Sequence, residues 1–450
     1  MSIKVNILSY FLKGNTRSKL AKKNIAYSIF LKGLSVVTTF LLVPITINYI
    51  SATQYGIWLT LSSIVSWMSF FDVGLGNGLK NKLAQNNALD QNSNSKVFVS
   101  TTYVLLLIIS IGLFSIFFTA NTFIDWNKIL NVKNSTEKFS TIALTVFGLF
   151  CVQFVVQLLN TVLTACHAVA KVSLLLLISQ VITLLCVFLL TKYTHSSLLL
   201  LVSINGGIPV IVHIIASIWY YKNELKKFAP SFKFVDFKYA PLLLGSGGIF
   251  FIIQIGALIL FQTDNIVIVQ IFGPASVTEF NIAYKLFSVF IIGFNIIVTP
   301  LWSAFTDAYV VKDFGWIESI MTKMKYVWLF ISISSVLLLF VAPYIYKIWI
   351  KNTIEIPISL SLSMSFYIIA YTWQTLHVYF LNGINKIRLQ LYLVIISSII
   401  NIPIAIFLAK RIGLAGITIS NAVLFTFMGL IFSYQTKKIL RNEAKGILNA

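Results

Sequence analysis

Charged residues are scarce in this chain. Only 10% of its 450 residues are Asp, Glu, Lys or Arg, and just 13 residues are acidic. A soluble domain carries about 25% charged residues, because its surface has to face water. At the same time, 58% of the residues are hydrophobic. This composition excludes a water-soluble globule, and most of the surface must face lipid.

Cysteine is also rare, and the short motifs of the common enzyme classes are missing. Cys151, Cys166 and Cys186 show no paired spacing, so neither a disulfide framework nor a zinc site is indicated. The sequence contains no HExxH motif, no nucleophile elbow and no Walker-type nucleotide loop. We therefore expect a protein that is not an enzyme and that binds no cofactor.

What the sequence does contain is a series of long apolar stretches. Crossing about 30 Å of hydrocarbon takes about 20 residues of helix, and only helices or closed barrels can span lipid. The stretches lack the alternating pattern of barrel strands, so they predict helices. We count twelve, at approximately 24–50, 55–74, 98–119, 142–163, 172–190, 198–220, 242–271, 280–304, 326–346, 356–381, 389–409 and 414–434.

The basic residues predict the orientation of these helices. The net charge is +21, but the 34 Lys and Arg residues do not gather in one domain, so no nucleic-acid partner is expected. Most of them lie before the first stretch, after the last and in alternate loops, which is typical of cytoplasmic segments. Both termini are therefore predicted to be cytoplasmic. Residues 222–238, the basic linker, would lie inside, and residues 121–141, the long outer loop, would lie outside.

The pattern of the first half recurs in the second. The hairpin segment that begins at Tyr49 has a counterpart that begins at Ile271. Both copies would start on the cytoplasmic side and contain six helices, which is the arrangement of parallel repeats. We predict an N-terminal lobe, 1–225, with helices 1–6, and a C-terminal lobe, 226–450, with helices 7–12. Substrate sites lie between such repeats, so a central cavity is expected.

Polar residues inside the apolar stretches are the candidate site. An ionisable group at the bilayer centre costs about 2.5–3.5 kcal/mol, so each one needs an explanation. In the first, second, seventh and eighth stretches, polar residues recur on one helical face. In the second stretch these residues are Ser62, Ser66 and Asp72. We expect these four helices to surround a wet cavity and the others to lie outside it. The candidate cavity residues are Lys32, Asp72, Gln254, Asp264, Asn281, Lys285, Ser288 and Asn295.

Depth in the membrane suggests two ion pairs among these candidates. At about 1.5 Å per residue, Lys32 and Asp72 reach the same inner level, and Asp264 and Lys285 both lie in the outer half. Other roles stay open. Lys32 could extend to the interface, Asp72 could cap a helix, and the second pair could be purely structural.

Several short motifs resemble those of one membrane-protein family. The run Tyr55-Gly-Ile-Trp, followed by the Phe-Asp-Val-Gly-Leu-Gly-Asn-Gly run from Phe71, resembles the second-helix signature of Wzx-type polysaccharide flippases. These belong to the MATE-like multidrug/oligosaccharidyl-lipid/polysaccharide (MOP) exporter superfamily. The segments that begin at Thr263, Leu381 and Gly413 resemble its later motifs. The resemblance implies an all-α polytopic membrane protein with about 12 transmembrane helices in two six-helix lobes around a central cavity.

The resemblance also implies a function. Such a flippase moves undecaprenyl-pyrophosphate-linked oligosaccharide repeat units from the cytoplasmic to the periplasmic leaflet of the bacterial inner membrane, for O-antigen or another surface polysaccharide. It opens its cavity alternately to each side. Its partners would be that lipid-linked oligosaccharide, membrane lipid and other polysaccharide assembly proteins. Coupling to protons or sodium ions through Asp72 or Asp264 stays open.

Two other functions also stay open. A cation-coupled multidrug antiporter of the same superfamily would use the cavity carboxylates and would not need Lys32 or Lys285. A membrane polysaccharide polymerase would typically carry its reacting groups in a large outer loop, and the long outer loop here has only about 20 residues.

Overall fold

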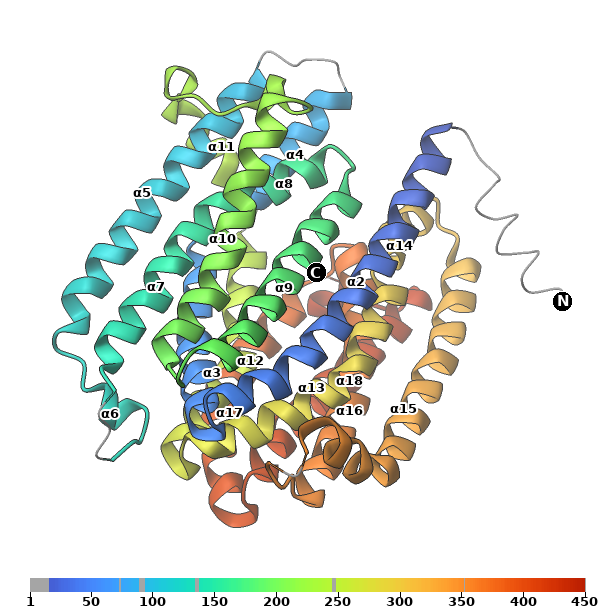
Figure 1. Ribbon diagram of the computed structural model, residues 1–450. Coiled ribbons are helices and arrows are strands. Elements are labelled where there is room, and N and C mark those ends of the chain that lie inside the picture. Colours follow the sequence, from blue (N-terminus) through green and yellow to red (C-terminus); the bar gives the residue numbers. More distant parts are fainter. Residues whose placement is uncertain are drawn as a thin grey trace, which may run out of the picture. The chain divides into compact units, whose positions relative to one another are not determined.

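The fold is helical throughout the part of the chain that the structure describes. We analysed a computed structural model, which describes residues 16–72, 74–88, 94–133, 137–244, 248–351 and 353–449. Within these ranges it contains helices and turns and no strand (Figure 1). The expectation of an all-α protein is therefore confirmed.

The chain forms two compact units, which we call the N-terminal and C-terminal units. The N-terminal unit takes the described parts of Met1–Ser51, Met68–Trp126 and Thr136–Gly248, and the C-terminal unit takes those of Ala52–Trp67, Asn127–Ser135 and Ile249–Ala450. The C-terminal unit thus includes one helix from the first half of the sequence. The predicted repeat boundary at residue 225 concerns internal symmetry and stays a prediction.

The N-terminal unit combines long apolar helices with shorter ones. They are α2 (Thr16–Tyr49), the 3-10 helix η1 (Trp67–Asp72), α4 (Leu75–Ala88), α5 (Ser95–Asn121), α7 (Phe139–Val156), α8 (Leu158–Ala165), α9 (Val169–Tyr193), α10 (Leu198–Lys222), the 3-10 helices η3 (Lys226–Phe228), η4 (Phe232–Phe234) and η5 (Phe237–Tyr239), and α11 (Ala240–Leu244). The short helix α6 (Trp126–Ile129) lies where the chain passes from one unit to the other.

The C-terminal unit contains most of the remaining helices. They are α3 (Ala52–Ser66), α12 (Gly248–Phe272), α13 (Pro274–Val298), α14 (Leu301–Val310), α15 (Phe314–Ile350), α16 (Ile358–Gly383), α17 (Arg388–Ile412), α18 (Ala415–Leu440) and the 3-10 helix η6 (Gly446–Asn449). In this unit α18 packs along α16 and α17, and α3 packs along α13.

The helices account for the predicted membrane spans. Nine segments of the described chain are long and apolar enough to cross a membrane, and they coincide with nine of the twelve predicted stretches. The other three stretches correspond to α3, α12 and α16. The prediction of about twelve spanning helices therefore agrees with the fold, and the chain is a multi-pass membrane protein.

The second predicted stretch, 55–74, is not one continuous helix. It ends as α3 at Ser66, continues as the 3-10 helix η1, and turns into α4 after Gly74. Gly74 has a φ of +82°, a conformation that glycine adopts without the steric cost other residues meet. Because the helix is interrupted, Asp72 does not continue the polar face of Ser62 and Ser66. The expected alignment of these side chains was wrong for this reason.

A stripe of leucines anchors α4 in the N-terminal unit. Leu75, Leu79 and Leu83 recur every four residues and are at most 1% exposed. They join a cluster with side chains of α5 and α8, on which α4 packs. The chain that follows the interrupted helix is thus held by ordinary helix packing.

A glycine brings α3 against α13 in the C-terminal unit. A Cβ atom on Gly56 would lie 1.8 Å from the carbonyl oxygen of Pro274, which is far inside van der Waals contact. Thr278 also donates a hydrogen bond of 2.6 Å to the carbonyl of Ala52. Small residues allow such close approach between helices in membranes, where packing replaces the hydrophobic effect. This contact fixes α3 as a wall of the site.

Candidate functional site

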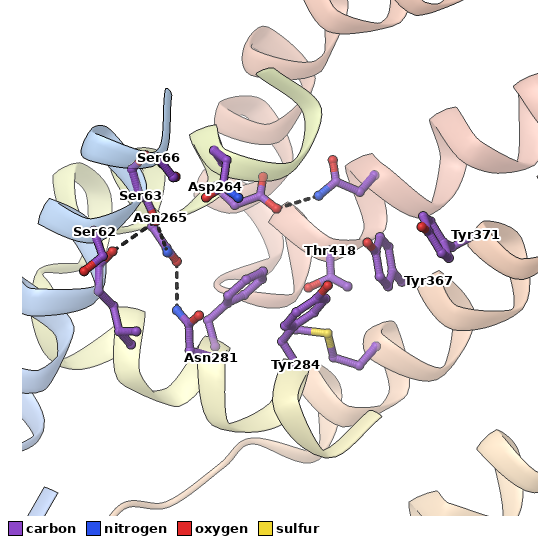
Figure 2. Close-up of a pocket in the computed structure, with 15 residues that line it drawn as sticks. Ser62, Ser63, Ser66, Asp264, Asn265, Asn281, Tyr284, Tyr367, Tyr371 and Thr418 are labelled. Atoms are coloured by element: carbon purple, nitrogen blue, oxygen red, sulfur yellow. Dashed lines mark hydrogen bonds between the residues drawn. The ribbon is translucent and has the colours of Figure 1, made fainter. Parts of the chain in front are cut away.

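The C-terminal unit encloses a cavity of about 570 Å³. Helices α3, α12, α13, α16 and α18 each contribute to its wall (Figure 2). Its volume is within the range of about 300–1,000 Å³ that small-molecule sites occupy. The polar side chains of its wall are Ser62, Ser63, Ser66, Gln262, Asp264, Asn265, Asn281, Tyr284, Tyr367, Tyr371, Thr418 and Asn421.

Asp264 provides the carboxyl group of the described wall. Its side chain is buried, at 7% exposure, and its Oδ2 accepts a hydrogen bond of 2.7 Å from the Nδ2 of Asn421. The Oδ1 of Asn421 and the Oγ1 of Thr418 are buried and have no hydrogen-bond partner among the described residues. A carboxylate, an amide oxygen and a hydroxyl oxygen therefore lie in one wall, with acceptor capacity unused.

A chain of amides and a hydroxyl connects three helices across the cavity. The Nδ2 of Asn265 donates to Ser63 at 2.6 Å, and the Nδ2 of Asn281 donates to the Oδ1 of Asn265 at 2.8 Å. Asn281 also donates to the carbonyl of Val277 on its own helix, at 2.8 Å. Figure 2 shows the first two bonds joining α3, α12 and α13. This ladder satisfies polar groups that lipid could not satisfy.

Tyrosines from α13 and α16 supply the aromatic part of the wall. Tyr367 and Tyr371 lie one turn apart on α16 and stack with ring centroids 5.9 Å apart. Tyr284 lies 6.3 Å from Tyr367, centroid to centroid. In the view of Figure 2 these tyrosines lie on one side of Asp264, and the ladder that contains Asn265 lies on the other. The cavity thus combines aromatic rings, neutral hydrogen-bonding groups and one carboxylate.

The predicted ion pair between Asp264 and Lys285 is absent from the structure. The Nζ of Lys285 donates to the hydroxyl of Tyr55 at 2.9 Å and lies 5.7 Å from the centroid of that ring. Lys285 does not line the cavity. Asn281, one turn earlier on α13, faces α12 instead, where it bonds Asn265. The prediction was wrong because depth along a helix does not determine which side of it a residue occupies.

Lys32 and Asp72 do not form the other predicted pair. No ion pair between described residues includes either of them. Lys32 is exposed on α2. Both oxygens of Asp72 accept from the backbone N–H of Gly76, at 3.0 and 3.2 Å, so this carboxylate stabilises the first turn of α4. It also lines a cavity of about 260 Å³ within the N-terminal unit, together with Asn160.

The remaining predicted site residues lie along α12 and α13. Gln254 belongs to α12, but its side chain is outside the described residues. The hydroxyl of Ser288 donates to the carbonyl of Lys285, on its own helix, at 2.9 Å. Asn295 is half-buried further along α13. Of the eight predicted residues, the structure brings Asp264 and Asn281 into the cavity wall.

Sequence reasoning missed the contribution of α16 and α18. The tenth and twelfth stretches were expected to lie outside the cavity, and this was wrong, because both line it. Signals were present in the sequence. Thr418 and Asn421 are three residues apart, and Tyr367 and Tyr371 are four apart, so each pair shares a helical face. These residues are neutral, and a search for ionisable groups passes over them.

Comparisons with known proteins agree with this architecture. Two relatives bear the name "Putative O-antigen transporter": one of Salmonella typhi, 21% identical over 91% of this chain and 94% of its own length, and one of Salmonella typhimurium, 22% identical over 87% and 91%. Among solved structures, an inward-facing multidrug resistance MATE family transporter of the MOP superfamily superposes with a TM-score of 0.75 at 12% identity, covering 92% of this chain and 98% of that one. An outward-facing conformation gives 0.67 at 12% identity, covering 96% and 98%.

These structural neighbours show the fold, which is that of MATE transporters of the MOP superfamily, and the resemblance inferred from the short motifs is confirmed. The model of the family described as polysaccharide biosynthesis protein matches residues 21–305. Because this match spans more than half of the sequence, the chain belongs to the polysaccharide biosynthesis protein family.

Proposed function

We propose that this protein is a transporter that moves undecaprenyl-pyrophosphate-linked oligosaccharide repeat units to the outer leaflet of the bacterial inner membrane. The units would serve O-antigen or another surface polysaccharide, and the protein would work by alternating access. Family membership, the names of the Salmonella relatives and the MATE transporter fold support this proposal. Both termini would face the cytoplasm, as the basic residues predict.

The observation that carries the proposal is the chemistry of the 570 Å³ cavity. A sugar presents apolar C–H faces, which pack on aromatic rings, and hydroxyl groups, which both donate and accept hydrogen bonds. The wall offers the rings of Tyr284, Tyr367 and Tyr371 to pack against the C–H faces. Asn265 and Asn281 offer side-chain amides for hydrogen bonds with the hydroxyl groups. We assign the sugar part of the cargo to this cavity.

The pyrophosphate of the cargo would lie outside this cavity. No Lys or Arg belongs to the described wall, and its acidic residue, Asp264, would repel a phosphate when it is ionised. Lys285 is hydrogen-bonded to Tyr55 and does not line the wall. When the sugars lie in the cavity and the pyrophosphate lies outside it, the lipid tail can stay in the bilayer. No free energy is then spent on removing the tail from lipid.

The membrane potential would drive export. A pyrophosphate group with about two negative charges that leaves an inside-negative cell gains about 2.3 kcal/mol per charge per 100 mV. Asp264, the Oδ1 of Asn421 and the Oγ1 of Thr418 would add a coupling site. Such oxygen atoms suit a hard cation such as sodium, and the carboxylate alone suits a proton.

Proteoliposomes test the proposal. The purified protein should flip a lipid-linked oligosaccharide without ATP and respond to an imposed potential. Tyr371→Leu should slow flipping at least fivefold, because it removes a ring from the wall. Tyr344→Leu is the matched control, since Tyr344 is 70% exposed on α15. Transport that requires ATP, or that ignores both potential and ion gradients, would contradict the proposal.

One observation favours a second function, a cation-coupled multidrug antiporter. A buried carboxylate beside tyrosine rings fits an organic cation, through charge attraction and cation–π contact. Tetraphenylphosphonium uptake by the same proteoliposomes distinguishes the two functions. The antiporter would be established if three results were obtained together. An ion gradient drives the uptake, Asp264→Asn abolishes it, and the protein does not flip the oligosaccharide.

A further inference from the structure

A second polar cavity in the C-terminal unit is lined by cations from two helices. It has a volume of about 340 Å³ and lies between α15, α16 and α18. Lys325 enters its wall from α15, Lys437 from the last turn of α18, and Arg441 from the residue that follows that helix. Glu318 is the carboxylate of this wall. The described wall therefore carries a net charge of about two positive units at neutral pH.

These cations form no close ion pair with a described carboxylate. No ion pair between described residues includes Lys325, Lys437 or Arg441, although the carboxylate of Glu443 is close enough to Lys437 and Arg441 to interact with both electrostatically. Lys438 makes an instructive contrast, because it pairs with Glu443 at 2.7 Å. Lys437 and Arg441 could serve only to offset the dipole at the end of α18. That explanation does not apply to Lys325, which comes from another helix.

A buried histidine in the same wall has an unused nitrogen. His377 of α16 is 2% exposed, and its Nε2 has no hydrogen-bond partner among the described residues. Its Nδ1 lies 3.1 Å from the hydroxyl of Thr436, which also lines the cavity. The ring of Trp373 packs on the imidazole at 4.9 Å, centroid to centroid. When Thr436 donates to Nδ1, the Nε2–H becomes a donor without a partner.

Exposed aromatic and apolar side chains continue from this cavity along the same two helices. Tyr326 and Phe330 of α15 are 69% and 70% exposed, and Leu430 and Tyr434 of α18 are 61% and 55% exposed. An acyl chain that lies against these residues would bring its headgroup to the cations. By the distribution of basic residues, this end of the helices is predicted to be cytoplasmic.

We propose that this cavity binds the phosphate headgroup of an anionic membrane lipid, with Lys325, Lys437 and Arg441 as its charge partners and His377 as a donor. Basic pockets between spanning helices recognise such headgroups at the cytoplasmic side. The phosphate chemistry alone would also admit a soluble phosphate. The exposed apolar residues beside the cavity favour the lipid. The site is separate from the 570 Å³ cavity and does not depend on the cargo assigned to it.

Native mass spectrometry of the full-length protein in detergent tests the site. Phosphatidylglycerol should stay bound at concentrations at which phosphatidylcholine does not. The double variant Lys325→Gln with Lys437→Gln should weaken phosphatidylglycerol binding by about thirtyfold, which is the effect of two charge contacts with anionic lipid. The matched control is Lys312→Gln with Lys323→Gln. These lysines are exposed in the same region of the chain and do not line the cavity, so binding should change less than twofold.

The histidine has its own pair of variants. His377→Gln places an amide nitrogen near the position of Nε2 and should keep binding within about threefold, whereas His377→Leu should weaken it by tenfold, the effect of one hydrogen bond to a charged group. Equal weakening in the cavity and control lysine variants would overturn the proposal. Binding of inorganic phosphate with the same sensitivity to Lys325→Gln and Lys437→Gln would overturn the assignment to lipid. Gel filtration of each variant identifies loss of folding, and the lysine variants, which lie at the surface, provide the test if His377→Leu does not fold.

Discussion

Double-mutant cycles measure whether the buried Asp264 depends on Asn421 or on Lys285. The structure places Asn421 Nδ2 2.7 Å from the carboxylate, whereas Lys285 bonds Tyr55. Asn421→Ala alone leaves a buried carboxylate without that donor, and should lower the free energy of unfolding by about 1–3 kcal/mol. In Asp264→Ala protein the same change should cost much less, because the carboxyl group that accepts the hydrogen bond is gone.

The size of the expected coupling follows from the contact. Hydrogen bonds between helices in membranes couple by about 0.6 kcal/mol on average and by up to about 1.7 kcal/mol. The Asp264–Asn421 bond is short, both side chains are at most 7% exposed, and the acceptor is a carboxyl oxygen. We therefore expect a coupling of about 1–1.7 kcal/mol. Asp264 and Lys285 are not in contact, so the free-energy changes caused by Asp264→Ala and Lys285→Ala should add to within about 0.5 kcal/mol.

Unfolding by sodium dodecyl sulfate in mixed micelles provides the free energies for both cycles. Export of surface polymer, measured in parallel, separates stability from function. A coupling above about 1 kcal/mol between Asp264 and Lys285, together with none between Asp264 and Asn421, would refute the reasoning. It would mean that the ion pair expected from depth exists in the protein after all.

Three further predictions concern packing, the lysine and orientation. Gly56→Ala should lower the free energy of unfolding by more than about 3 kcal/mol, since its Cβ would lie 1.8 Å from the carbonyl oxygen of Pro274. Gly33→Ala is the control in the same unfolding assay. It should be tolerated, because no atom lies within 4 Å of the position of its Cβ. Lys285→Ala and Tyr55→Phe each remove the hydrogen bond between these two side chains, so each should lower the free energy of unfolding by about 1–3 kcal/mol; because Lys285 does not line the 570 Å³ cavity, export by the folded protein should fall less than about twofold, and loss of export at a normal protein level would contradict this placement. In a cysteine-free background, single cysteines in the long outer loop should react with impermeant maleimide from outside intact cells, and those in the basic linker should not; the reverse pattern would invert the topology.

The spanning helices were predictable from sequence because each residue of a stretch contributes its own hydropathy, and these contributions add up along the stretch. About 20 apolar residues in a row exclude other structures in lipid, whatever their neighbours are. The interruption at η1 was not predictable in this way. Hydropathy passes through Trp67–Asp72 without a break, and only the left-handed backbone at Gly74 together with the leucine stripe of α4 redirects the chain.

The site was harder to predict because it depends on rotation about each helix axis. Asn281 and Lys285 are four residues apart, which is about 6 Å along the helix and about 40° around it. That difference decides that Asn281 faces α12 while Lys285 reaches α3. Because charged residues are scarce, Asp264 stood out in the sequence, and the structure places it in the cavity wall. Its neutral partner Asn421 lies 157 positions away, and a single sequence contains no signal that joins the two.

The placement of α3 has a consequence for how the protein is made. Its partner α13 is translated much later: 226 positions separate Thr278 from Ala52, with which it bonds. At about 5–20 residues per second, α3 waits roughly 10–45 s for that helix to emerge. During this interval the hydroxyl of Ser63 lacks the amide of Asn265 that bonds it in the finished protein. Biogenesis therefore passes through a period in which a helix already synthesised has no lasting neighbour, and membrane chaperones and proteases have that time to act on it.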